Sequence, residues 1–130
     1  MKIFILEDSI VRQNWFIDNF NSHALTIIDN AIDAIKLLEM VFYDIIFLDH
    51  DLSDKHYEAV ISGNNIEFDD TGYSVAKIIP NTINKNSIII IHTHNPIGAE
   101  RMKNILPMAM TRPFGTFGQK IICEVLQKKR

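Results

Sequence analysis

The stretch IIFLDHD at residues 45–51 decides the fold, because four apolar residues run directly into acidic and imidazole side chains. A run that is apolar throughout is typical of a strand that is buried on both faces of a parallel sheet. In open parallel sheets, ligands bind outside the carboxyl ends of the strands. The stretch therefore predicts a central strand at residues 45–48 and a polar site that begins at Asp49.

Short apolar runs on both sides of this strand alternate with helical patterns, which is typical of a doubly wound sheet. The expected strands lie at residues 3–6, 25–28, 45–48, 88–91 and 108–110, and the expected helices at about residues 10–20, 31–42, 71–80, 96–106 and 116–128. We therefore predict an α/β fold in which a five-stranded parallel sheet lies between two helical layers, with flavodoxin-like topology.

The chain of 130 residues is 47% hydrophobic, which is enough for the core of one domain spanning residues 1–130. Residues 52–70 carry charges and few regular patterns, so we predict an inserted loop that is long enough to act as a lid. The single cysteine, Cys123, lies among apolar residues, which predicts a buried helical thiol and no internal disulfide.

Charge and hydropathy exclude several kinds of partner. The net charge of -3 provides no overall basic field, so we expect no general binding to duplex nucleic acid. No apolar run approaches the roughly 20 residues of a membrane span, and the apolar start of the chain is too short for a signal peptide. We therefore expect a cytoplasmic protein that does not contact membranes.

Charged and imidazole side chains follow four of the expected strands. They are Glu7 and Asp8 after the first strand, Asp49 and Asp51 after the third, His92 and His94 after the fourth, and Arg112 after the fifth. Parallel strands end at one edge of the sheet, so these residues should converge. Clustered carboxylates repel one another, and a hard divalent cation stabilises them most simply. We predict that Glu7, Asp8, Asp49 and Asp51 bind Mg²⁺ or Mn²⁺.

His92 and His94 are two residues apart, so in extended backbone both project to the same side of the sheet. Two imidazoles there suit general acid and base catalysis near neutral pH, or metal binding. If the histidines are metal ligands, Zn²⁺ and Ni²⁺ become candidates beside Mn²⁺. The alternative is that both histidines are core or capping residues with hydrogen bonds to the backbone.

Three residues are candidates for binding a phosphate group: Arg112, Asn95 and Thr71. Arg112 can make a bidentate contact with phosphate, or else an ion pair with Asp49 or Glu7 across the pocket. Asn95 begins a helix whose first amides are able to bind an anion. We expect the ligand to be a small molecule that contains phosphate, or an RNA end.

The sequence also resembles a known family. The acidic pair Glu7 and Asp8, the strand-end Asp49, the TGY segment at residues 71–73 and the RPF segment at residues 112–114 resemble the receiver domains of two-component response regulators. In receivers the acidic pair binds magnesium and the aspartate after the third strand accepts a phosphoryl group. The resemblance implies these roles for Glu7, Asp8 and Asp49.

Three features differ from typical receivers. Arg112 replaces the late lysine, the segment HTHN at residues 92–95 replaces a strand-end hydroxyl residue, and extra residues separate Asp51 from Gly72. With DHDL at residues 49–52 and TGY at residues 71–73, the longer segment HTHNPIGAE at residues 92–100 resembles the receiver-like domains that process cyclic phosphates. This resemblance implies phosphoester chemistry.

The leading hypothesis is a metal-assisted phosphoesterase, a hydrolase that opens a cyclic phosphate at an RNA end, as in RNA repair, or in a cyclic nucleotide. The cation would polarise the phosphate and activate water, while His92 and His94 transfer protons. In an alternative mechanism Asp49 attacks as a covalent nucleophile. Two other functions remain open: an atypical receiver that is phosphorylated on Asp49, and a module that binds a cyclic nucleotide without turnover.

Overall fold

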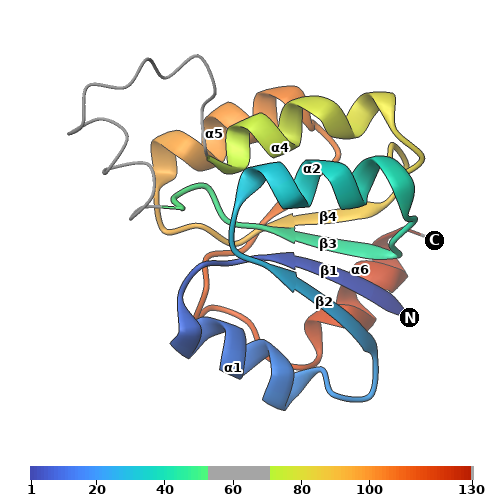
Figure 1. Ribbon diagram of the computed structural model, residues 1–130. Coiled ribbons are helices and arrows are strands. Elements are labelled where there is room, and N and C mark those ends of the chain that lie inside the picture. Colours follow the sequence, from blue (N-terminus) through green and yellow to red (C-terminus); the bar gives the residue numbers. More distant parts are fainter. Residues whose placement is uncertain (53–70, 130) are drawn as a thin grey trace.

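The computed structural model describes residues 1–52 and 71–129, which form a five-stranded parallel sheet between two layers of helices (Figure 1). The strands are β1 (Lys2–Leu6), β2 (Ala24–Ile28), β3 (Ile45–Leu48), β4 (Ile88–Ile91) and β5 (Met110–Thr111). Their order across the sheet is β2-β1-β3-β4-β5, and all neighbours pair in parallel. This order confirms the predicted doubly wound fold.

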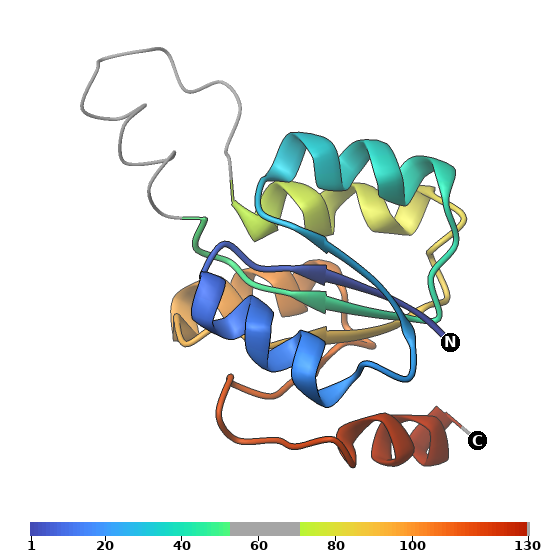
Figure 2. The ribbon, with the colours of Figure 1, turned by 60° about the horizontal axis from the view of Figure 1, so that its bottom comes forward.

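The helices cover both faces of the sheet. They are α1 (Ile10–Asn19), α2 (Ala31–Met40), α4 (Gly72–Ile78), the 3-10 helix η1 (Ile79–Asn81), α5 (Pro96–Ile105) and α6 (Ile121–Lys129). Helices α2, α4 and α5 lie on one face, whereas α1 and α6 lie on the other, as the two views show (Figures 1 and 2). Both faces of the sheet are therefore covered by helices, and the central strand β3 is buried on both sides.

Two apolar clusters fill the space between the sheet and its helices. Phe4 and Ile46 face α2, α4 and α5, whereas Ile5 and Phe47 face α1 and α6. All four residues of β3 are fully buried, because the sheet's two faces are both covered. The uniformly apolar strand sequence, which predicted this arrangement, is therefore explained by burial on both sides.

The carboxyl-terminal part of the chain differs from its prediction. Strand β5 is the pair Met110–Thr111 rather than residues 108–110, and Met108 is 92% exposed. Helix α6 begins at Ile121 rather than near Thr116, because the chain turns first at Gly115, whose φ is 93°. Cys123 was predicted to be buried but is exposed, since Ile121, Ile122 and Val125 form the buried side of this helix.

The predicted lid at residues 52–70 lies outside the described residues, except for Leu52, which is buried in the core. The predicted helix after Thr71 ends at Ile78 and continues as the short helix η1, which has Pro80 in its first turn. Among the described residues no helix is both long and apolar enough to cross a membrane.

Candidate active site

The candidate site lies at the edge of the sheet where β1, β3 and β4 end. Leu6, Leu48 and Ile91 are paired across these strands, so the residue that follows each strand lies beside its neighbours. These following residues are Glu7, Asp49 and His92, and all three are buried. One carboxylate oxygen or imidazole nitrogen of each lies within 4.8 Å of the others. The strand register itself thus assembles a set of potential metal ligands.

Glu7 is held in its charged form by its neighbours. Burial opposes its ionisation, but the hydrogen bond and charge of His92, followed by the Ser9 amide and the Arg12 guanidinium, keep the pKa of Glu7 below its usual value. The distance from His92 Nε2 to Glu7 Oε1 is 3.0 Å, and the Ser9 N–H donates to Oε2 at 3.1 Å. Glu7 therefore provides a fixed negative charge at the centre of the site.

Asp49 has the opposite electrostatic environment. Burial, together with the charge of Glu7, raises the pKa of Asp49 to about 6, although His92, a hydrogen bond with Thr93 and the His50 amide favour its charged form. Asp49 is only 4% exposed. Two buried carboxylates so close together repel each other, and a cation between them would relieve this repulsion.

A pocket of about 250 Å³ opens onto this cluster, and it is lined by Glu7, Asp8, Ser9, Arg12, Asp49, Asp51, Thr93 and His94. The structure therefore brings together all four carboxylates that the sequence predicted as metal ligands. Asp51 has a side chain that is 53% exposed, whereas Glu7 and Asp49 lie at the bottom of the pocket. The volume is sufficient for a cation, several waters and a phosphate group, since a water molecule occupies about 30 Å³.

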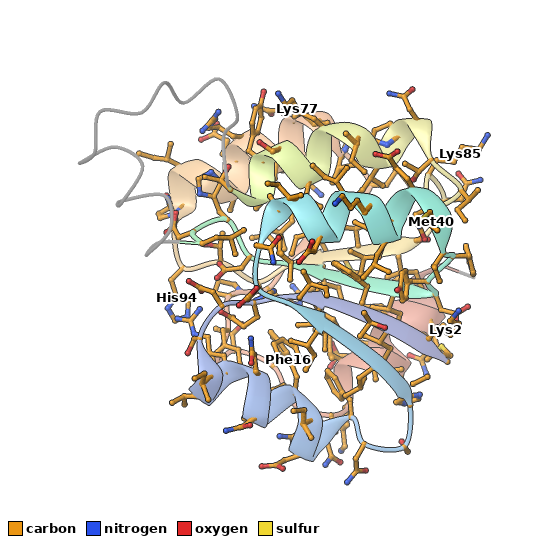
Figure 3. All side chains as sticks on the ribbon, viewed as in Figure 1. Lys2, Phe16, Met40, Lys77, Lys85 and His94 are labelled. Carbon is orange, nitrogen blue, oxygen red and sulfur yellow. The ribbon has the colours of Figure 1, made fainter. Side chains whose placement is uncertain are left out.

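The two predicted catalytic histidines lie on the side of the sheet that packs against α1 and α6, but at different depths. His92 is fully buried between the rings of Phe16 and Phe47, at centroid distances of 5.4 and 6.2 Å. Its Nδ1 has no hydrogen-bond partner within residues 1–52 and 71–129. His94 is exposed at the edge toward which the strands run, as Figure 3 shows.

Asn95 and Thr71, which were predicted to bind phosphate, cap helices in the structure. Asn95 Oδ1 accepts the Gly98 amide at the start of α5, and the Asn95 carbonyl accepts the next amide. Pro96 has no N–H, so most of the amides that were expected to bind an anion are unavailable. Thr71 Oγ1 accepts the Tyr73 amide at the start of α4.

The starts of α4 and α5 pack closely against Asp49 and His50. A Cβ atom at Gly72 would lie 1.8 Å from the Asp49 carbonyl oxygen, and one at Gly98 would lie 2.4 Å from Cγ of His50. Only glycine permits such close contact. His50 Nδ1 lies 2.8 Å from Asp51 Oδ1, which also accepts Asn95 Nδ2 at 3.2 Å. Helices α4 and α5 therefore fix the backbone and side chains at residues 49–51.

The arginine in the pocket is Arg12 and not Arg112. Arg112 pairs its backbone amide with the Ile91 carbonyl, and its side chain makes no hydrogen bond or ion pair with another described residue. Arg12 is in the first turn of α1, and its guanidinium lies 3.8 Å from Glu7 Oε1. Sequence reasoning missed Arg12, although its position four residues after Asp8 on the helix that leaves the site was an available signal.

Comparison with solved structures shows that the fold is that of receiver domains. The receiver domain of a sensor histidine kinase from Pseudomonas aeruginosa, solved with magnesium in its active-site cleft, is 24% identical, with a TM-score of 0.67 over 98% of this chain and 94% of that one. A Burkholderia pseudomallei response regulator with a phosphorylated aspartate is 14% identical, with a TM-score of 0.72 over 98% and 67% of the two chains. A Vibrio cholerae chemotaxis protein is 15% identical, with a TM-score of 0.68 over 98% and 96%.

A family model described as the cyclic-phosphate processing receiver domain matches residues 2–107, so the chain belongs to this family. This match confirms the resemblance seen in the sequence. No curated protein matches the chain.

The donor atoms in the pocket fit a divalent cation. Carboxylate oxygens are the ligands that Mg²⁺ and Mn²⁺ prefer, and Glu7, Asp8, Asp49 and Asp51 all line the pocket. His92 Nε2 lies close enough to be a further ligand, and a nitrogen ligand favours Mn²⁺ or Zn²⁺ over Mg²⁺. In this geometry, however, Nε2 already lies at hydrogen-bonding distance from Glu7.

Proposed function

We propose that the protein is a metal-assisted phosphoesterase that opens a cyclic phosphate, at an RNA end or in a cyclic nucleotide. The observation that carries this proposal is the buried cluster of Glu7, Asp49 and His92, whose donor atoms lie within 4.8 Å of one another at the bottom of a polar pocket. Membership of a family named for processing cyclic phosphates supports the same substrate class.

Glu7 and Asp49 would hold the cation at the bottom of the pocket, with Asp8 and Asp51 nearer its opening. When bound, the cation would polarise the phosphate oxygens and lower the pKa of a bound water. The protein's own contribution is to keep Glu7 charged through His92 and to exclude bulk water from the buried side of the pocket.

Opening a cyclic phosphodiester adds one water across a P–O bond and yields a phosphomonoester and a free hydroxyl group. The attacking water loses a proton, and the leaving oxygen gains one. His92, which lies beside both carboxylates, is the candidate for this transfer, since imidazole is the side chain that most often transfers protons in enzymes.

A second candidate function is an atypical receiver that is phosphorylated on Asp49. The observation that favours it is the fold, because Asp49 follows β3 in the same pocket as the acidic pair Glu7 and Asp8. His92 follows β4 and is buried against Phe16 and Phe47, so this strand end differs from the receiver pattern in having an imidazole beside the Thr93 hydroxyl group that hydrogen-bonds with Asp49. This difference is the reason to prefer the phosphoesterase.

The experiment incubates the protein with 2',3'-cyclic nucleotides, 3',5'-cyclic nucleotides and RNA that ends in a 2',3'-cyclic phosphate. Each substrate is tested with Mg²⁺, Mn²⁺ or a chelator, and the ligand is recovered by denaturation and identified by chromatography. An enzyme returns a phosphomonoester only with metal. A binding module returns the ligand intact, and a receiver instead acquires an acid-labile phosphate at Asp49 from a small phosphodonor.

A further inference from the structure

Arg12 is held in a fixed position at the wall of the acidic pocket. Its guanidinium lies over the ring of Phe114, 5.0 Å from the ring centroid, and its Nη2 lies 3.3 Å from Nδ1 of His94. Its Nη1 lies 3.8 Å from Glu7 Oε1. A guanidinium group has more N–H donors than these contacts use, arranged in a fork that fits a phosphate group.

The contacts of His94 define where its proton lies. The Phe114 carbonyl can only accept a hydrogen bond, so Nε2 of His94, at 2.6 Å, carries the proton and donates it. The Arg12 guanidinium can only donate, so Nδ1 of His94 is the acceptor. Both nitrogens of His94 are therefore in use, an arrangement that holds Arg12 rather than one that exchanges protons with a substrate.

An ion pair with Glu7 does not by itself explain the position of the Arg12 guanidinium. The distance of 3.8 Å is too long for a hydrogen bond, and the same oxygen of Glu7 already has His92 as a partner at 3.0 Å. The side chain of Arg12 is 26% exposed, whereas that of Glu7 is 1% exposed. The guanidinium therefore lies between the buried carboxylate and the open pocket, where a ligand would meet it.

We propose that Arg12 binds the phosphate group of the ligand and that His94 is a positioning residue that holds Arg12, an inference that rests on the proposed function. An anionic phosphate needs positive charge to enter this pocket, because four carboxylates line it. A cation at Glu7 and Asp49 would offset part of the negative charge. Among the described residues that line the pocket, Arg12 is the only arginine or lysine. Arg12 thus takes the role that the sequence assigned to Arg112.

The test measures binding of inorganic phosphate to the Mn²⁺-loaded protein by calorimetry, so it does not depend on turnover. We expect Arg12→Gln to weaken phosphate binding about tenfold or more, which corresponds to the loss of a charge-assisted hydrogen bond. Arg12→Lys keeps the positive charge but loses the forked arrangement of donors, so its phosphate affinity should lie between those of the wild type and Arg12→Gln. Arg101→Gln is the matched control, because Arg101 is on α5 against Tyr73 and does not line this pocket.

The inference is overturned if Arg12→Gln binds phosphate as the wild type does, if Arg112→Gln is the variant that loses binding, or if the wild type binds no phosphate. Failure to hydrolyse any cyclic phosphate, with binding that depends on Arg12, would contradict the proposed function and leave the binding role of Arg12 intact. Mn²⁺ affinity, measured in the same titrations, should not fall in Arg12→Gln.

Two variants of His94 test its positioning role. In His94→Gln the side-chain amide can still accept from Arg12 and donate to the Phe114 carbonyl, whereas His94→Leu can do neither. We expect phosphate affinity within about threefold of the wild type in the first variant and a loss of about fivefold or more in the second. Unchanged phosphate affinity in both variants, with equal loss of turnover, would assign proton transfer to His94 and overturn its positioning role.

Discussion

The metal-free protein should become less stable as the pH rises from 4 to 7, because the site contains a buried carboxylate with a raised pKa. Burial and the charge of Glu7 raise the pKa of Asp49 from 3.8 to about 6. This stabilisation of the protonated form is fully present below pH 4 and is lost as the pH rises through 6. The shift corresponds to a loss on the order of 3 kcal/mol in the free energy of unfolding.

Glu7 does not cancel this effect. The pKa of Glu7 in the folded protein is below its usual value of 4.5, so its contribution to stability is present above that pH and is lost only as the pH falls further. Between pH 5 and pH 7, the change in the free energy of unfolding therefore reports the ionisation of Asp49 once the contribution of the histidines is subtracted.

Asp49→Asn provides that subtraction. Asparagine cannot ionise, and its side-chain oxygen can still accept the His50 amide, as Asp49 Oδ1 does at 2.9 Å. Urea unfolding in EDTA should show the variant gaining stability relative to the wild type as the pH rises, by up to about 3 kcal/mol at pH 7.5. Saturating Mn²⁺ should raise the free energy of unfolding of the wild type at this pH, but not that of the variant. Parallel pH profiles for the two proteins in EDTA would refute the electrostatic account of Asp49.

Three further variants test other parts of the site. Glu7→Gln should weaken Mn²⁺ binding at least about tenfold in a calorimetric titration, since it removes the carboxylate that is held in its charged form; an unchanged affinity would place the cation elsewhere. Gly72→Ala should lower the free energy of unfolding by about 3 kcal/mol, because its Cβ meets the Asp49 carbonyl, whereas Gly118→Ala, with open space around it, should change it by less than about 1 kcal/mol; equal effects in urea unfolding would contradict this packing. His92→Ala should cost about 2 to 4 kcal/mol of stability and lower turnover about a hundredfold, because it leaves a cavity between two rings and removes a partner of Glu7; wild-type turnover in a folded variant would exclude a catalytic role for His92.

The sheet was predictable from the sequence because its strands are buried on both faces. The runs at residues 45–48 and 88–91 are apolar at every position, and the structure places both strands within those bounds. The start of α6 was not predictable in this way. Phe114 and Phe117 have helical spacing, but they pack against Trp15 from the irregular segment before α6, at ring-centroid distances of 5.4 and 5.5 Å. Apolar spacing alone does not distinguish a helix from a turn that reaches the core.

The candidate site was predictable where it depends on strand register. Glu7 and Asp49 each follow a strand, and the paired strands bring them together. His92 and His94 both follow β4, but their spacing in the sequence carries no information about how deeply each is buried. The place of Arg12 depends on how α1 crosses the sheet and on contacts with Phe114 and His94, residues about a hundred and about eighty positions away in the chain. Such long-range packing could not be read from local patterns.

The most direct test of the phosphoesterase is a single-turnover reaction with a short RNA that ends in a 2',3'-cyclic phosphate. Wild-type protein in excess is mixed with the RNA in Mn²⁺, Mg²⁺ or chelator, and the RNA end is identified by chromatography. The account predicts conversion to a phosphomonoester with metal, none with chelator, and conversion about a hundredfold slower in Glu7→Gln. Intact cyclic phosphate recovered from folded, metal-loaded protein, with 2',3'-cyclic and 3',5'-cyclic nucleotides also unchanged, would contradict it.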